Sequence, residues 1–261
     1  MEYVIIILAA FGAAMLTFFS GFGLGTILMP VFMLFFPVEI AISMTAIVHL
    51  ANNLFKASLI WRHIHFKVVA WFAIPAAVAA FAGALLLNRL SDNTELFSYY
   101  LGEHLMQVTT LKLVIALLLA LFAVMEIDRR FEKIQLNKGW LPLGGMLSGF
   151  FGGLSGHQGA LRSMFLLRAG LNKEGFVATG IAAAIVIDIS RLTVYGTSFF
   201  SRYFTSVKDE SWSLVLVACM AAFAGSFFGR RALKKITLRG VQVTVGILIL
   251  ALAMLLGSGF I

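Results

Sequence analysis

The sequence has few of the residues on which disulfide-bonded or catalytic soluble domains depend. Its 261 residues include a single cysteine, Cys219, so an internal disulfide and a cysteine-based metal cluster are excluded. Charged residues make up 12% of the chain and hydrophobic residues 61%, whereas soluble domains are about 45–50% apolar. No stretch is both long and polar enough to form a separate soluble domain. We therefore expect one all-α integral membrane domain that covers residues 1–261.

Motifs of soluble enzymes are absent as well. The sequence contains no His-Glu-x-x-His, no Gly-x-Ser-x-Gly and no Walker loop. The run Gly21-Phe22-Gly23-Leu24-Gly25 suggests a dinucleotide fingerprint, but it follows a membrane segment instead of a soluble strand and is not interpreted as one. The first segment lacks a basic n-region, so we expect a retained helix and not a cleaved signal peptide. No cofactor and no metal site are predicted.

Hydrophobic runs predict about ten helical segments. About 20 apolar residues cross a ~30 Å hydrocarbon core as a helix. Two of the predicted segments, 22–36 and 157–170, are too short, because ~15 residues at a rise of 1.5 Å span only ~22 Å. We interpret them as half-helices, which hydrocarbon tolerates only where protein or a cavity surrounds the broken backbone. The sequence leaves open whether they span or re-enter. The other predicted segments are 3–19, 41–61, 67–88, 109–127, 140–153, 175–197, 212–230 and 239–259.

Basic residues gather in alternate connections between these segments. Examples are Arg62, Lys67, Arg129, Arg168 and Arg230. The positive-inside rule assigns these connections to the cytoplasm, which places both termini outside the cell inner membrane. The net charge of +8 thus reflects topology, and no nucleic-acid partner is predicted. On the other side, residues 88–108 form the longest loop.

Three short motifs occur in the same order in both halves of the chain. They are Ser20-Gly21-Phe22 with Ser148-Gly149-Phe150, Thr45 with Thr179, and Ala79-Ala80-Phe81-Ala82-Gly83 with Ala221-Ala222-Phe223-Ala224-Gly225. The matches predict two repeats of five segments, approximately residues 1–130 and 138–261. An odd number of segments inverts the second repeat relative to the first. Inverted repeats with broken helices are typical of secondary transporters.

The segment 41–61 carries a polar stripe on an otherwise apolar helix. The stripe consists of Thr45, His49, Asn52, Asn53 and Lys56, and the last four fall at i, i+3, i+4 and i+7 on one helix face. Such a stripe should face the bundle interior or a cavity. There it would line a substrate pathway or form hydrogen bonds between helices. Lys56, near the cytoplasmic end, would take part in coupling or gating, or extend its amine to the interface.

Two charged residues, Asp188 and Arg191, lie three positions apart and deep in the segment 175–197. Each charge costs about 2.5–3.5 kcal/mol on insertion scales. The spacing allows a structural salt bridge between the two side chains. Alternatively, Asp188 orients Arg191 or accepts a coupling proton, while Arg191 binds an anion.

Polar residues follow the second glycine cluster. A half-helix that begins near Gly156 would point free N–H groups and the positive end of its dipole into the bundle, which favours an anion. Arg162, about one turn further on, has a fork of donors that suits sulfonate, carboxylate or phosphate oxygens, unless it pairs structurally with Asp188. His157 is either a proton acceptor or a hydrogen-bonding cap. The predicted site also includes Gly21, Gly23, Gly25, Gln158 and Thr179.

Both glycine clusters resemble those of a known family. The run 20–61 with its core SGFGLGTILMP, followed by Arg62-His63-Ile64-His65 and residues 79–83, resembles the first half of a TauE/SafE family protein. The run SGFFGGLSGHQGALR resembles the second half, so the resemblance covers nearly the whole chain. It implies an inner-membrane transporter of sulfite, of sulfonates such as sulfoacetate, or of related organosulfur anions.

Together these features predict a transporter of a small sulfur-containing anion that works by alternating access around a midplane site. The expected partners are that anion, the lipid bilayer and, as a candidate coupling ion, a proton carried by Asp188, His49 or His157. Three alternatives stay open: an anion channel on the same scaffold, a membrane-embedded enzyme using His49 or His157, and a non-transporting assembly subunit. The lack of a nucleophile–base motif argues against the enzyme. The sequence leaves open whether the protein forms a homodimer.

Overall fold

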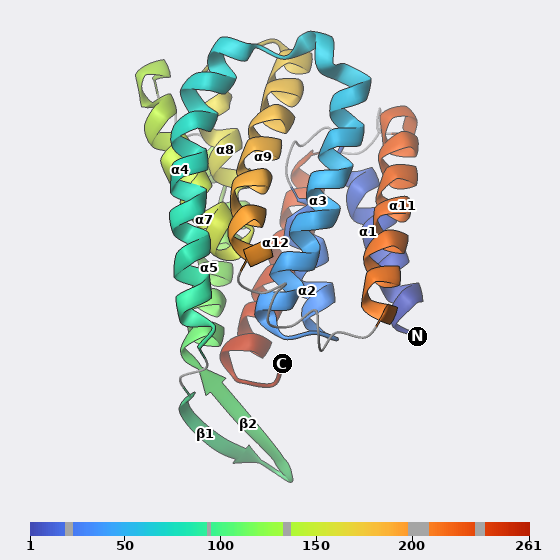
Figure 1. Ribbon diagram of the computed structural model, residues 1–261, viewed down its shortest axis with the longest axis vertical. Coiled ribbons are helices and arrows are strands. Elements are labelled where there is room, and N and C mark those ends of the chain that lie inside the picture. Colours follow the sequence, from blue (N-terminus) through green and yellow to red (C-terminus); the bar gives the residue numbers. More distant parts are fainter. Residues whose placement is uncertain (19–22, 93–94, 133–136, 198–208, 233–237) are drawn as a thin grey trace.

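A bundle of helices with one projecting β-hairpin makes up the protein (Figure 1). The computed structural model describes residues 1–18, 23–92, 95–132, 137–197, 209–232 and 238–261. Its helices are α1 (Glu2–Leu16), α2 (Leu24–Met33), α3 (Val38–Ile60), α4 (Phe66–Leu90), α5 (Thr110–Ile127), α6 (Arg129–Glu132), α7 (Leu141–Ser155), α8 (Gly159–Leu166), α9 (Lys173–Tyr195), α11 (Asp209–Ala232) and α12 (Leu238–Gly257). The hairpin consists of β1 (Glu95–Leu101) and β2 (His104–Thr109).

Every predicted segment coincides with a helix, and the main differences are in length. Within the described residues, five spans are long and apolar enough to cross a membrane: Val38–His63, Phe66–Leu90, Thr110–Ile127, Lys173–Tyr195 and Trp212–Gly229. By contrast, α1 and α7 have 15 residues each, or about 22 Å. The half-helices are shorter than their predicted ranges, with 10 residues in α2 and 8 in α8. The protein is thus a helical membrane protein in which several helices end inside the bundle.

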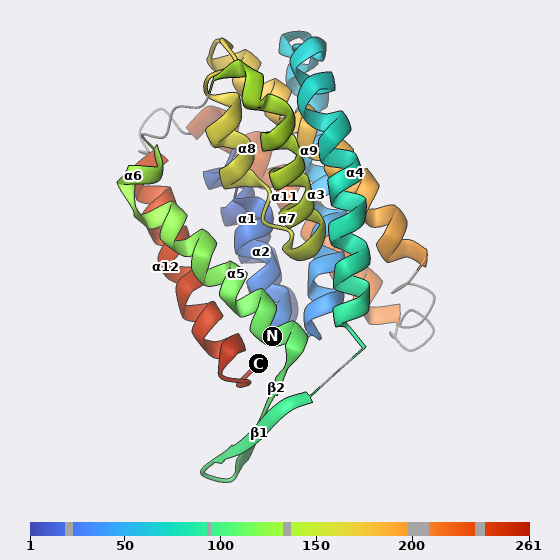
Figure 2. The ribbon, with the colours of Figure 1, turned by 90° about the vertical axis from the view of Figure 1, so that its left-hand side faces the viewer.

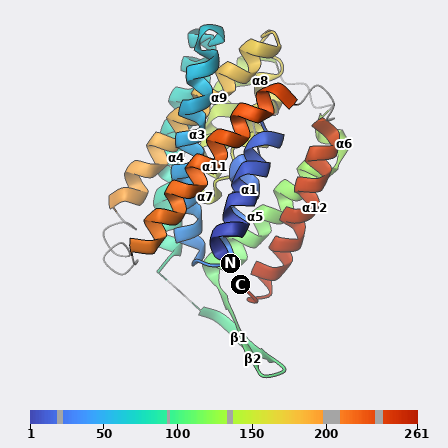
Figure 3. The ribbon, with the colours of Figure 1, turned by 90° about the vertical axis from the view of Figure 1, so that its right-hand side faces the viewer.

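The short helices form two hairpins that turn back within the bundle. The N-terminus and the connection from α2 to α3 lie at the end that carries the β-hairpin, so α1 runs inward from that end and α2 returns to it (Figures 1 and 3). At the opposite end, α7 runs inward and α8 returns (Figure 2). The two helix hairpins therefore enter from opposite ends. Their tips, at the glycine clusters, point toward the middle of the bundle.

The helices α3 and α9 contact each other at the centre, and the remaining helices pack around them in pairs. α4 packs along α7 and α9, α11 packs along α1 and α3, and α5 packs along α12 (Figures 2 and 3). In the predicted repeats, α1 to α5 correspond in order to α7, α8, α9, α11 and α12. Under this correspondence, the packing of α4 on α7 and α9 matches that of α11 on α1 and α3. This match supports the inverted repeat, which stays a prediction. The motif Ser148-Gly149-Phe150 lies within α7, and the break follows it at residues 156–158.

Glycines allow α7 to approach α4 very closely. Gly145, Gly149 and Gly153 are spaced four residues apart on one face of α7, and a Cβ atom on any of them would lie 2.0–2.1 Å from a carbonyl oxygen of α4. The repeated motif makes a similar contact in each half, because Gly83 of α4 faces a carbonyl oxygen of α7 and Gly225 of α11 faces one of α1. Small residues at such interfaces let membrane helices pack backbone to backbone.

The predicted outer loop 88–108 is largely ordered as secondary structure. Its first residues continue α4 to Leu90, and β1 and β2 pair antiparallel over most of the remainder. The Tyr99 hydroxyl donates a hydrogen bond to the carbonyl oxygen of Ser258 at 2.6 Å. This contact ties the hairpin to the chain just beyond α12.

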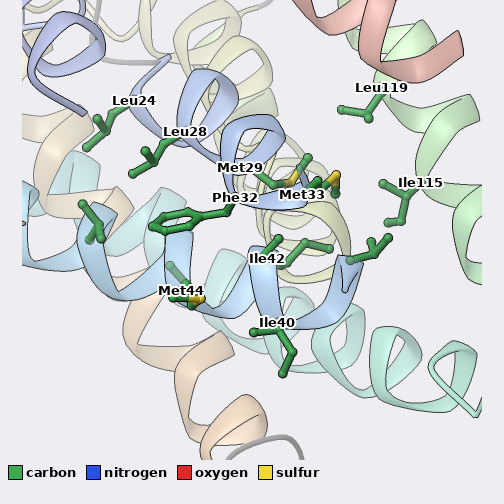
Figure 4. Close-up of a cluster of buried hydrophobic side chains, with 14 of the residues drawn as sticks. Leu24, Leu28, Met29, Phe32, Met33, Ile40, Ile42, Met44, Ile115 and Leu119 are labelled. Carbon is green, nitrogen blue, oxygen red and sulfur yellow. The ribbon is translucent and has the colours of Figure 1, made fainter. Parts of the chain in front are cut away.

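Apolar side chains fill the bundle between its centre and the β-hairpin end (Figure 4). They come from α2, α3 and α5, and all are at most 5% exposed. We call this set the outer apolar layer; it consists of Leu28, Met29, Phe32, Met33, Ile40, Ile42, Met44, Ile115 and Leu119.

We expect Gly149→Ala to destabilise the fold, because the added methyl group would meet the Ala76 carbonyl oxygen at 2.0 Å. Overpacking of this kind costs about 1–3 kcal/mol. Thermal unfolding of the purified protein in detergent measures the loss. Gly12→Ala is the matched control, because a Cβ there meets nothing within 4 Å and alanine favours a helix. Equal melting temperatures for Gly149→Ala and wild type would contradict the close packing of α4 and α7.

Candidate functional site

The tips of the two helix hairpins meet at glycine residues beside α3. A Cβ atom on Gly25, in the first turn of α2, would lie 3.8 Å from the carbonyl oxygen of Gly156 and 3.6–3.8 Å from the side chains of His49 and Thr45. Gly156 ends α7 with a φ of 79°, and Gly23 precedes α2 with a φ of 111°. Both values lie in the left-handed region that glycine adopts readily. The two breaks, predicted from separate glycine clusters, thus lie next to each other.

Asp188 on α9 is the centre of a network of buried hydrogen bonds. Its Oδ2 accepts a hydrogen bond from Nδ1 of His49 on α3 at 2.6 Å. Its Oδ1 accepts from Nε and Nη2 of Arg191 at 3.0 and 2.7 Å. The same Oδ1 accepts from Nε2 of Gln158 at 2.9 Å. One carboxylate therefore joins α3, α9 and the break before α8.

The network extends in two directions from Asp188. On one side, Oε1 of Gln158 accepts a hydrogen bond from Nη1 of Arg162 on α8 at 2.9 Å. On the other, Arg191 donates to the carbonyl oxygen of Gly152 at 3.1 Å, and the Tyr195 hydroxyl donates to the carbonyl oxygen of Gly153. The last turn of a helix leaves carbonyl groups without helical partners. Side chains of α9 bind this last turn of α7 and hold the broken end in place.

The network contains more positive than negative charge. Arg162, Arg191 and Asp188 are each at most 2% exposed, and guanidinium groups stay protonated in proteins. The network as described has two guanidinium groups and one carboxylate. Moving an ion out of water costs several kcal/mol unless a counter-charge lies close by. Burial of these three charged groups is therefore possible only because they lie close to one another.

Three buried polar atoms have no hydrogen-bond partner among the described residues: Oγ1 of Thr45, Nδ2 of Asn52 and Nε2 of His157. Their side chains are at most 4% exposed. The His157 ring is fixed in place, because its Nδ1 bonds to the carbonyl oxygen of Ser155 at 2.9 Å and the ring stacks on Phe122. Since buried polar groups are normally hydrogen-bonded, these three atoms are available to a ligand.

A small pocket lies between the His49–Asp188 pair and the end that carries the basic loops. Its lining residues are Thr17, Phe18, Leu24, His49, Asn53, Lys56 and Ile181. The Lys56 ammonium lies 5.5 Å from the centroid of the Phe18 ring, a cation–π arrangement. Nδ2 of Asn53 lies 3.1 and 3.4 Å from the two ring nitrogens of His49. Part of the polar stripe predicted on segment 41–61 therefore faces this pocket.

Other predicted site residues have different surroundings. Oγ1 of Thr179 accepts a hydrogen bond from the backbone N–H of His65 at 3.1 Å, so this threonine ties α9 to the residues before α4. Oδ1 of Asn52 accepts from the Ser226 hydroxyl at 2.7 Å and connects α3 to α11. Gly21 lies outside the described residues.

Residues of the site that were not predicted from the sequence include Tyr195, Ser226, Phe122 and the pocket-lining Thr17, Phe18, Leu24 and Ile181. Tyr195 lies seven residues after Asp188, on the same face of α9, and this spacing could have identified it. Ser226 directly follows the repeated motif at residues 221–225. Nothing in the sequence distinguishes Phe122, the partner of the His157 ring, from the many apolar residues around it.

These features define a multi-pass helical membrane protein with a buried, charged centre at two broken helices, as in membrane transporters. A family model described as Sulfite exporter TauE/SafE matches residues 6–256, so the chain belongs to the TauE/SafE sulfite exporter family. Membership implies a membrane exporter of sulfite or organosulfur compounds, with an anionic substrate and a lipid environment. The resemblance of both glycine clusters to the TauE/SafE family is thereby confirmed as family membership. Comparisons with curated proteins and with solved structures give no match.

We expect Asp188 and Arg191 to stabilise the fold as a pair, so that the stability losses of the two single variants do not add up. Removing one member of this directly bonded pair leaves the other without its partner, which costs about 3–5 kcal/mol, whereas removing both members leaves neither of them unpaired. Asp188→Asn and Arg191→Met should therefore each lower the melting temperature in detergent, and the double variant should lose less than the sum. The exposed Arg168→Met is the control for loss of an arginine. Strict additivity would show that the pair does not stabilise the fold.

Proposed function

We propose that this protein is a secondary transporter of small sulfur-containing anions, such as sulfite or sulfoacetate, and that it works by alternating access. One observation carries the proposal. Two buried guanidinium groups, of Arg162 and Arg191, and one carboxylate, Asp188, lie at the meeting point of the two helix hairpins, and the buried amine of Lys56 lines the adjacent pocket. Transporters with inverted repeats bind substrates at broken helices near the membrane midplane. Family membership supplies the substrate class.

Each part of the site has a role in this proposal. The guanidinium groups of Arg162 and Arg191 offer paired donors that fit sulfite or sulfonate oxygens. The first turns of α2 and α8 add backbone N–H groups that favour an anion. The glycines at the breaks keep Cβ atoms away from the substrate. Polar side chains that complete the shell are Thr45, His49, Asn52, Asn53, His157 and Gln158.

In this proposal, the present conformation is closed toward the β-hairpin end. The outer apolar layer separates the charged centre from the β-hairpin end, and the pocket lies toward the basic loops. If the basic loops are cytoplasmic, both termini lie outside the inner membrane and the pocket faces the cytoplasm. If the two proposed repeats exchanged conformations, the site would open toward the β-hairpin end instead.

We expect Arg162→Gln to impair substrate transport, because it removes the fork of donors on α8. The measurement is uptake of labelled sulfite and sulfoacetate by proteoliposomes, and the initial rate at low substrate should fall at least tenfold, the equivalent of about 1.4 kcal/mol. The exposed Arg168→Gln, a change of the same kind outside the bundle, should transport like wild type. Unimpaired uptake by folded Arg162→Gln would remove this residue from the site.

The same proteoliposomes distinguish the transporter from its alternatives. Saturable uptake and counterflow of labelled substrate support a carrier, whereas steady single-channel current would indicate an anion channel. Chemical conversion of the substrate would indicate an enzyme. Absence of both uptake and counterflow of either anion, with folded wild-type protein, would overturn the proposal.

We expect the pocket to be reachable from the basic-loop side only. Lys56→Cys, in a Cys219→Ala background, should react with a membrane-impermeant thiol reagent applied to vesicles whose basic loops face the reagent. Leu28→Cys, in the outer apolar layer, is the matched control and should not react from either side without substrate. Labelling of Leu28→Cys from the β-hairpin side at the rate of Lys56→Cys would contradict the proposed orientation of this conformation.

A further inference from the structure

The imidazole of His49 has one nitrogen that is free to take up a proton. Nδ1 lies 2.6 Å from Oδ2 of Asp188, and because an ionised carboxylate only accepts hydrogen bonds, Nδ1 carries a hydrogen. In the neutral ring, Nε2 is then the acceptor. Nδ2 of Asn53 lies beside the ring, 3.1 Å from Nδ1 and 3.4 Å from Nε2. Both His49 and Asn53 line the small pocket on the basic-loop side of the centre, and we expect the proton to arrive from this side.

We propose that the coupling ion is a proton and that it binds at Nε2 of His49. The inference rests on the transport function proposed above. The proton comes from water in the pocket and forms one N–H bond at Nε2, while the hydrogen on Nδ1 stays in place. The ring becomes an imidazolium with a single positive charge. The Asn53 amide then turns its oxygen toward the new N–H group, and no other bond changes.

Asp188 connects this proton to the anion site. Its Oδ2 faces His49, while its Oδ1 holds Arg191 and Gln158. When His49 is neutral, Arg191 is the main positive group that interacts with the carboxylate of Asp188. A protonated His49 competes for that charge and frees Arg191 to bind an anion. Proton and anion therefore favour each other's binding, and by thermodynamic linkage the effect is reciprocal. The two ions should cross the membrane together.

The other charges around His49 make proton binding depend on the substrate. Asp188, which bonds to the ring, and Arg191 lie on α9, Arg162 lies on α8, and Lys56 lines the same pocket as His49. The packing helix α2 has no titratable side chain, and α11 approaches α3 with Ser226 and an aromatic contact. In this proposal, the positive charge of the arginines counts against a further positive charge on His49 as long as no anion is bound. An anion next to the arginines offsets them and admits the proton.

The test uses His49→Gln, which keeps a side-chain donor for Asp188 but cannot take up a proton. Proteoliposomes are given a pH gradient, acidic outside, with the membrane potential clamped at zero by potassium and valinomycin. Sulfoacetate is the probe, because its sulfonate stays ionised and a pH gradient cannot drive it across as a neutral acid. Wild type should accumulate it up to about tenfold per pH unit if one proton accompanies each anion. His49→Gln should reach no accumulation, and whatever counterflow it shows should not respond to the pH gradient.

The controls separate this inference from the transport function itself. His63→Gln, an exposed histidine on the basic-loop side, should keep both accumulation and counterflow. Wild-type counterflow that ignores the pH gradient would overturn proton coupling and leave the transporter intact. Accumulation by His49→Gln equal to that of wild type would overturn the assignment to His49. Absence of wild-type counterflow would overturn the proposed substrate class instead.

A binding measurement gives a second test that needs no transport by the variant. Addition of sulfoacetate to purified wild-type protein in weak buffer should take up about one proton per anion bound, read with a pH-sensitive dye. Purified, folded His49→Gln should take up none. Anion binding without proton uptake by wild type, or equal uptake by both proteins, would overturn the proposal.

Discussion

The structure depends on keeping one buried carboxylate fully hydrogen-bonded. Asp188 is 0% exposed, and inside a membrane protein its charge must be balanced by the protein itself. Its partners come from three places in the chain: His49 on α3, Arg191 on its own helix and Gln158 at the second break. All three reach the carboxylate in the present arrangement of α3, α9 and the second helix hairpin. A polar centre of this kind fixes the relative position of elements that are otherwise held by apolar contacts.

The broken end of α7 is stable for two reasons that act together. Glycines let α7 lie almost backbone to backbone on α4, so its short length is compensated by close packing. Its last carbonyl groups, at Gly152 and Gly153, are bound by Arg191 and Tyr195 of α9. Arg191 thus holds both the carboxylate of Asp188 and the tip of the hairpin. In the proposed function, a shift of this guanidinium group toward an anion would also change its hydrogen bond to Gly152, and so would link anion binding to movement of the helix hairpin.

Hydropathy and side-chain periodicity were sufficient to predict the helices and the polar face of α3, because lipid imposes length and polarity on every span. The same patterns could not predict which neighbour each polar residue meets. Thr179 repeats Thr45 in the sequence yet bonds to the backbone of His65, and Asn52 faces α11 although its neighbour Asn53 faces the pocket. These contacts depend on how helices rotate and pair. The β-hairpin was also missed, since hydropathy does not distinguish a short exposed strand from a loop.

The two proposed repeats contribute different chemical groups to the centre of the bundle. The first half contributes the imidazole of His49, and the second contributes Asp188, Arg191 and Arg162. The bond between His49 and Asp188 therefore runs from α3 to α9, across the boundary between the proposed repeats. If one repeat moves against the other, the movement stretches or preserves this bond, together with others that cross the boundary, such as the one between Asn52 and Ser226. In the proposed function, the strength of the bond between His49 and Asp188 would depend on the proton and on the anion.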